Sequence, residues 1–66
     1  MIPLDQRCVH AVWALADRGD EEAFTLAKEP IEILYAFAVL IVSGEDKSEF
    51  ALRILAEAIA ARMEGS

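Results

Sequence analysis

Residues 31–42 read Ile-Glu-Ile-Leu-Tyr-Ala-Phe-Ala-Val-Leu-Ile-Val, and Glu32 is the one charged residue among them. This run is too short to cross a bilayer as a helix, which takes about 20 residues. A helix that is apolar nearly all round is typically buried on most sides, by its own fold or by a partner. A strand over residues 37–42, which are rich in β-branched side chains, is the alternative. We favour the helix because twelve residues exceed a typical strand and no other segment resembles a strand to pair with.

Three interruptions divide the chain into helices. Gly19 suits the left-handed position after a helix, and the neighbouring Asp20 can cap the next one. Pro30 disfavours helical backbone at the residue before it, and Gly44 ends the apolar run. We therefore predict an all-α fold, one helical domain over residues 1–66 that forms a small hairpin or bundle of three to four helices. The expected helices span about 3–18, 20–28, 30–43 and 46–63.

The outer helices have recognisable starts and faces. Pro3 suits a first helical turn, and the apolar residues that follow form one stripe: Leu4, Cys8, Ala11, Val12 and Leu15. Asp46-Lys47-Ser48-Glu49 resembles a capping box with Asp46 as the cap. Residues 11–23, around Arg18-Gly19-Asp20, resemble the corner of a single HEAT-type repeat. That resemblance implies a helix-to-helix corner and no function, since such solenoids need about three stacked repeats.

Charge and composition exclude several function classes. The 6 Lys+Arg against 12 Asp+Glu give 6 − 12 = −6 over 66 residues, and the basic residues are scattered singly. A chain without a basic stripe is not expected to bind nucleic acid directly. No secretion signal opens the sequence and no segment is long enough to span a membrane, so we expect a cytoplasmic protein without membrane contact.

Catalytic chemistry has few candidate residues. Cys8 and His10 are two positions apart, and side chains at that spacing diverge on a helix. One His and one Cys cannot supply the three or four ligands of a zinc site, and three scattered glycines form no phosphate-binding loop. We predict no enzyme activity, and no catalytic, metal-binding or cofactor-binding residues.

Helical projection leaves more apolar surface than one small chain can cover. We therefore expect a homodimer in which each chain contributes an antiparallel hairpin of its last two helices to a four-helix core. The expected dimer interface is Leu34, Phe37, Leu40, Ile41, Leu55 and Ile59. The narrow polar face of the last helix holds Glu49, Arg53 and Glu57, which are spaced four apart for weak pairing along that helix.

Two kinds of residue point to a protein partner. Trp13 and Tyr35 are typical interface anchors, although both could instead complete the core. Six carboxylates between positions 17 and 32 would attract a basic surface, although such a run can also serve solubility alone. The expected partner-binding residues are Trp13, Asp17, Glu21, Glu22 and Tyr35.

Three function classes follow. The first is a non-enzymatic, homodimeric adaptor or inhibitor that occludes a site on a larger cytoplasmic protein, for example a basic or DNA-binding one, in the style of small phage and bacterial regulators. The second is a subunit or chaperone-like component whose apolar helix is covered by a different protein. The third is a small enzyme or metal protein active across a dimer interface. The first accounts for size, acidity and excess apolar surface together.

Overall fold

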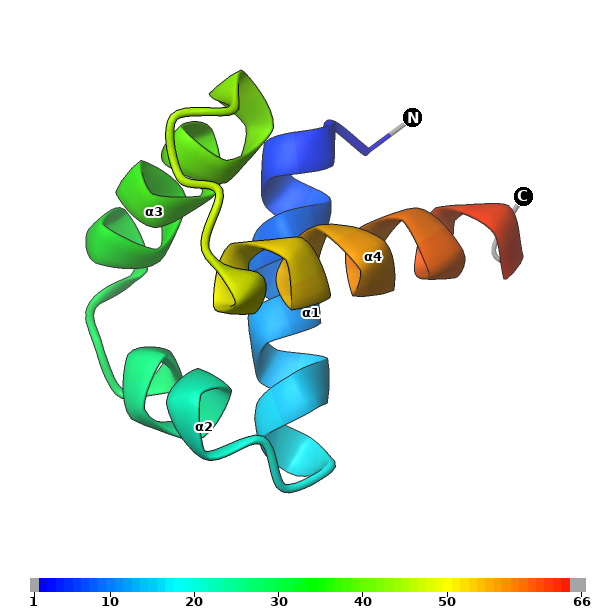
Figure 1. Ribbon diagram of the computed structural model, residues 1–66. Helices are drawn as coiled ribbons and strands as arrows, with labels where there is room; N and C mark the ends of the chain where they lie inside the picture. The colour runs from blue at the N-terminus through cyan, green and yellow to red at the C-terminus, as the bar shows by residue number, and fades with distance from the viewer. Residues whose placement is uncertain (1, 65–66) are drawn as a thin grey trace.

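Four α-helices and no strand form the part of the chain that the structure describes, so the predicted all-α class is confirmed (Figure 1). The structure is a computed structural model, which describes the backbone of residues 2–64 and the side chains of residues 2–61. The helices are α1 (Leu4–Asp17), α2 (Glu21–Ala27), α3 (Ile31–Ser43) and α4 (Glu49–Glu64). The alternative of a strand over residues 37–42 is wrong. Neither α3 nor any other described helix combines the length and apolar character needed to cross a membrane.

The helix ends follow the local chemistry of the sequence. Gly19 and Gly44 both have positive φ, at 99° and 84°, which glycine adopts without a steric penalty. The carboxylate of Asp20 accepts a hydrogen bond from the amide of Ala23 at 3.1 Å and caps α2. Pro30 directly precedes α3. The predicted interruptions thus coincide with the observed ones.

The start of α4 differs from the expected cap at Asp46. The hydroxyl of Ser48 accepts a hydrogen bond from the amide of Ala51 at 3.1 Å, which makes Ser48 the cap. Asp46 instead accepts from the amide of Ser48 at 3.0 Å, a local turn that holds residues 46–48 outside the helix. The helix therefore begins at Glu49, three residues later than predicted.

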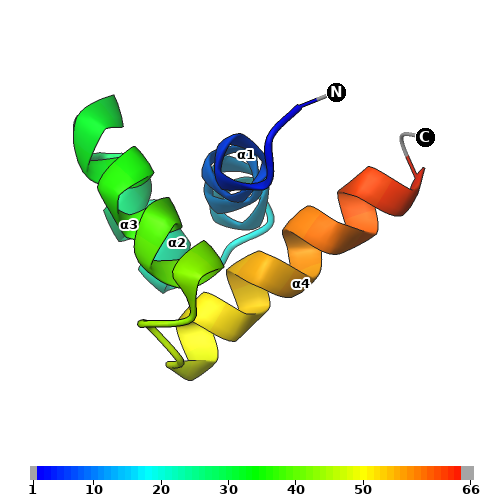
Figure 2. The same ribbon diagram turned by 90° about the horizontal axis from the view of Figure 1, so that it is seen from above.

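Helix α1 is the centre of the fold. Seen from above, α3 and α4 diverge from the loop between them, and α1 lies in the angle that they form (Figure 2). Both helices make most of their tertiary contacts with α1 and few with each other. The core is correspondingly built from α1 together with one face of each neighbour, and it consists of Cys8, Val9, Ala11, Val12, Ala23, Leu34, Ala38, Ile41, Ala51, Ile54 and Ala58.

This arrangement differs from the expected hairpin of the last two helices. The buried residues of α1 cover a wide arc, since Cys8 and Val9 are both buried although they project about 100° apart. One arc of that width can meet two helices at once. Within the chain, α1 therefore packs against one face of α3 and one face of α4. The expected dimer stays a prediction.

Candidate interaction surfaces

Among the described residues, α3 has more exposed large apolar side chains than any other helix. Four side chains that point away from α1 are exposed, and we call them the outer face of α3: Ile33, Ala36, Val39 and Leu40. Ile33 is 48% exposed and Val39 53%, although both are large aliphatic residues. Glu32 and Ser43 lie at the two ends of this face. An apolar patch with polar ends is typical of a protein interaction site.

A second surface is the groove between α1 and α2, which we call the Trp13 groove. It has a volume of about 620 Å³ and is lined by Trp13, Ala14, Ala16, Asp17, Phe24, Ala27 and Lys28. The ring of His10 stacks on that of Trp13 with centroids 5.7 Å apart, and the Lys28 ammonium lies 4.5 Å from the centre of the Phe24 ring. Trp13 is 42% exposed and Phe24 54%, so the groove presents two aromatic side chains to solvent.

The five expected partner-binding residues do not lie together. Trp13 and Asp17 share the Trp13 groove. Glu21 and Glu22 line a different groove, which faces Phe50 of α4. Tyr35 is half-buried and packs against the core from α3. Sequence reasoning missed Phe24, although its spacing of four from Lys28 was a signal for a cation–π pair on one helix face.

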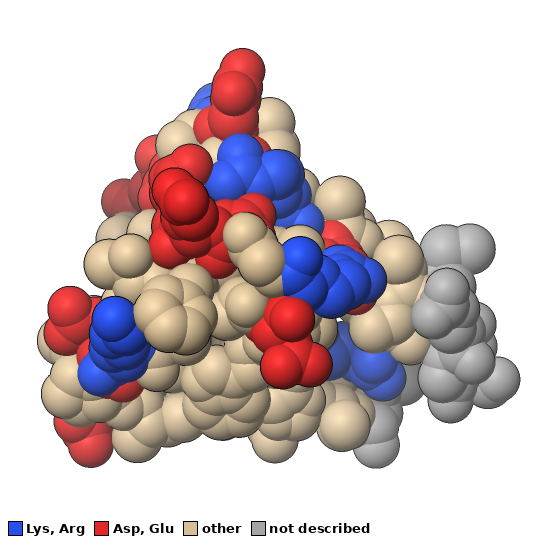
Figure 3. All heavy atoms as spheres, turned by 90° about the horizontal axis from the view of Figure 1, so that it is seen from below, with Lys and Arg blue, Asp and Glu red and all other residues tan. Residues whose placement is uncertain are grey.

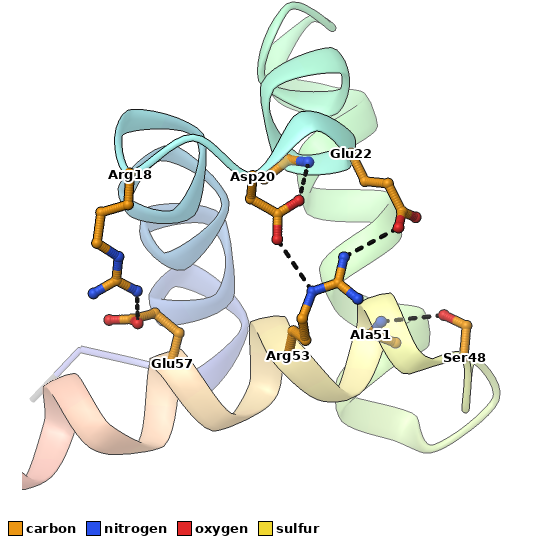
Figure 4. Close-up of polar contacts among 8 residues, drawn as sticks. Arg18, Asp20, Glu22, Ser48, Ala51, Arg53 and Glu57 are labelled. Atoms are coloured by element: carbon orange, nitrogen blue, oxygen red, sulfur yellow. Dashed lines mark hydrogen bonds and ion pairs between the residues drawn. The ribbon is translucent and has the colours of Figure 1, made fainter.

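The acidic corner between α1 and α2 is tied to α4 by ion pairs (Figure 4). The Arg53 guanidinium donates to Asp20 and to Glu22, each at 3.1 Å. Arg18 likewise pairs with Glu57. Arg53 and Glu57 thus reach across to other helices, whereas we expected them to pair along α4. They do so because the packing of α4 on α1 brings charges of opposite sign within reach.

These pairs change the electrostatics of the corner. The pKa of the Asp20 carboxyl lies below its ordinary value, first because the Ala23 amide donates to it and next because Arg53 does. The same carboxylates raise the pKa of Arg53. Acidic and basic side chains consequently stand next to one another on the face seen from below (Figure 3). The corner is less of an acidic patch than the run of carboxylates in the sequence indicates.

The residues expected in a dimer interface differ in how deeply they are buried. Leu34 and Ile41 are 2% and 4% exposed, because both pack against their own chain. Phe37 and Leu55 are half-buried beside the core. Leu40 and Ile59 are 42% and 44% exposed and are the members of this set that a second chain could contact without opening the core. An interface built on this set stays a prediction.

The Cys8 thiol and the His10 imidazole lie in different environments. Cys8 is fully buried, and burial, with a smaller contribution from Asp5, raises the pKa of its thiol. His10 is exposed and faces Trp13. Among the described residues, no three His, Cys, Asp or Glu side chains are grouped so that they could hold a metal ion.

Comparison with protein-family models, with curated proteins and with solved structures finds no match to this chain.

Proposed function

We propose that this protein is a non-enzymatic helical interaction module that acts as an adaptor or inhibitor by binding a larger protein and occluding a site on it. The observation that carries the proposal is the outer face of α3, where Ile33, Val39 and Leu40 are exposed on one helix. Full burial of one such side chain contributes about 1.5–3 kcal/mol. Because each of these side chains is already about half buried, a partner that covers this face gains less than this amount from each of them.

Acidity supports a partner with a basic surface. The net charge of −6 speeds encounter with a positively charged protein and makes binding weaker at high salt. The Trp13 groove offers a further contact, since aromatic side chains are typical anchors. On this proposal, α3 makes the apolar contact, and the net negative charge of the chain attracts the partner electrostatically. The protein works in the cytoplasm.

A homodimer is the second candidate. Leu40 and Ile59 are both exposed and both belong to the expected dimer interface. If a second copy covers α3, sedimentation equilibrium should give the mass of two chains, and Leu40→Gln should return it to one. If the chain alone has the mass of a monomer and gains mass only when another protein is added, the result favours the alternative in which a hetero-partner covers the apolar helix.

The test of the proposed function compares three baits in affinity capture: the parent chain, Leu40→Gln and Leu52→Gln. Leu52 is the matched control because it is also an exposed leucine, 56% exposed, but lies on α4. A partner retained by the parent and by Leu52→Gln but lost with Leu40→Gln supports the proposal. Equal retention by all three folded baits contradicts it.

A further inference from the structure

Both ends of the outer face of α3 carry net negative charge, whereas its centre carries none. Residues 28–32 contain Lys28, Glu29 and Glu32, so their net charge is 1 − 2 = −1. Residues 45–49 contain Glu45, Asp46, Lys47 and Glu49, so their net charge is 1 − 3 = −2. Between them, residues 33–44 have no charged side chain.

The carboxylates at these ends are available to a partner. Glu29, Glu32 and Glu45 are exposed, and none of the ion pairs found in the described part of the chain involves them. Lys28 lies over the ring of Phe24 on α2, so its charge is directed to the Trp13 groove. In sequence order, acidic residues therefore precede α3, apolar side chains form its outer face, and acidic residues follow it.

The shape of the face fits a helix. The 13 residues of α3 extend about 20 Å, a length that an incoming helix of three to four turns can match. Ala36 lies at the middle of the outer face, and its side chain is smaller than those of Ile33, Val39 and Leu40. Helices pack with the ridges of one in the grooves of the other, with their axes about 8–10 Å apart.

We propose that the outer face of α3 receives an amphipathic helix of another protein, apolar at its centre and bearing Lys or Arg at both ends; this rests on the proposed function. The apolar centre covers Ile33, Val39 and Leu40. The basic ends face Glu29 and Glu32 at one end and the acidic loop after Gly44 at the other. Helix-in-groove recognition of this kind combines apolar anchors with complementary charge.

A second copy of the chain fits this face less well. In an antiparallel pair of α3 helices, each end of charge −1 would face an end of charge −2. In a parallel pair, like ends would face each other, so repulsion arises in both arrangements. Each copy also brings a net charge of −6. Self-association through this face is therefore expected to strengthen with salt, whereas binding of a basic-ended helix is expected to weaken with it.

The experiment uses three synthetic helical peptides of about 18 residues and the full chain, with affinities measured by calorimetry at low and high salt. The first peptide has an apolar stripe and two Lys at each end. The second keeps the stripe and has Glu in place of Lys. The third keeps the Lys and has its apolar positions scrambled. We expect the first to bind at least tenfold more tightly than either of the others at low salt, and its affinity to fall with salt.

Protein variants locate the contact. Leu40→Gln should weaken binding of the first peptide about tenfold, and the control Leu52→Gln should leave it unchanged. Glu32→Gln should weaken it about twofold at low salt and not at high salt, whereas Glu21→Gln, an exposed carboxylate on α2, should have no effect.

Four results would overturn the inference, and they separate it from the proposed function. Equal binding of the Lys-ended and Glu-ended peptides would reject basic ends but keep the apolar face as a binding site. If the scrambled peptide binds as tightly as the first peptide, the binding is non-specific charge attraction and does not use the apolar face. A chain that self-associates more strongly with salt and excludes the peptides would assign the face to a second copy. A monomer that binds none of the peptides, and captures no protein in the bait comparison, would remove the proposed function as well.

Discussion

Single side chains connect distant parts of this small fold. Arg53 of α4 joins the corner before α2 by pairing with Asp20 and Glu22, which lie more than thirty positions earlier in the chain. Its spacing from Glu49 and Glu57 predicted pairs along α4 instead, because helical periodicity contains no information on which helix packs nearby. Asp20 could be predicted as a cap, since that role depends on local backbone alone, but its pairing with Arg53 could not.

Asp20→Asn should remove a pH-dependent part of the stability. The folded-state pKa of Asp20 is lowered, so its contribution is present above the ordinary pKa of about 3.9 and is lost as pH falls through the lower folded value. Asn keeps the cap but cannot attract Arg53. We expect the variant to have a lower urea midpoint than the parent at pH 7, with the difference shrinking toward pH 2. A difference that is constant from pH 7 to pH 2 would contradict the ion pair; Asp17→Asn is the control.

Cys8 should react slowly with thiol reagents in the folded chain. It is fully buried, and burial raises the pKa of the thiol, so little thiolate is present and access requires opening of the core. Labelling by a disulfide reagent at neutral pH should reach the rate of an unstructured thiol peptide only in concentrated urea. Rapid labelling of the native chain would show that α1 is not covered as described.

The helix ends were the most predictable feature of the secondary structure. Gly19, Pro30 and Gly44 act through their own backbone preferences, so their effects can be read without knowledge of the tertiary fold. The start of α4 was less predictable because Asp46 and Ser48 both suit a cap, and the choice between them depends on where the loop from α3 ends. Ser48 is the residue that bonds to the amide of the first helical turn.

Ser48→Ala should therefore destabilise the chain by about 1 kcal/mol, the usual effect of removing a helix cap. Ser43→Ala is the matched control: Ser43 is also exposed, but its hydroxyl donates to the Leu40 carbonyl inside α3 and caps no amide. Urea unfolding followed by circular dichroism measures both. A larger effect of Ser43→Ala than of Ser48→Ala would be inconsistent with the assigned cap.

Helix α1 determines how the other three helices are arranged, because each of them packs against it. The periodicity of α1 predicted a buried stripe that includes Cys8, Ala11 and Val12. It did not predict that Val9 is buried as well, because the width of the buried arc depends on two helices packing against α1. The expected dimeric hairpin followed from the excess apolar surface of α3 and α4. Part of that surface, including Leu34 and Ile41, is covered by α1 of the same chain. The part left uncovered lies on the outer face of α3, which the proposed interaction would cover.

The Trp13 groove gives a separate prediction for the assembled complex. If a captured partner occupies it, Trp13→Ala should weaken binding by about 2 kcal/mol, as expected for an aromatic anchor. Asp17→Lys, which reverses the charge of the carboxylate that lines this groove, should mainly slow association and change its salt dependence, because Asp17 is exposed. Affinities of folded variants should be measured at two salt concentrations. Parent-like binding of all variants at both would exclude this groove as a contact.

On the proposed function, the outer face of α3 is open in the single chain and is covered only by another protein. Methyl NMR with a soluble paramagnetic agent tests it directly, by measuring signal loss at Ile33, Val39 and Leu40 with Leu52 as the exposed reference. In dilute solution we expect all four to lose signal strongly. On addition of the Lys-ended peptide or a captured partner, the three α3 residues should become protected while Leu52 stays attenuated. Protection of the α3 methyl groups in the dilute, monomeric chain, or no change in them when a partner binds, would show that this face is not the binding site.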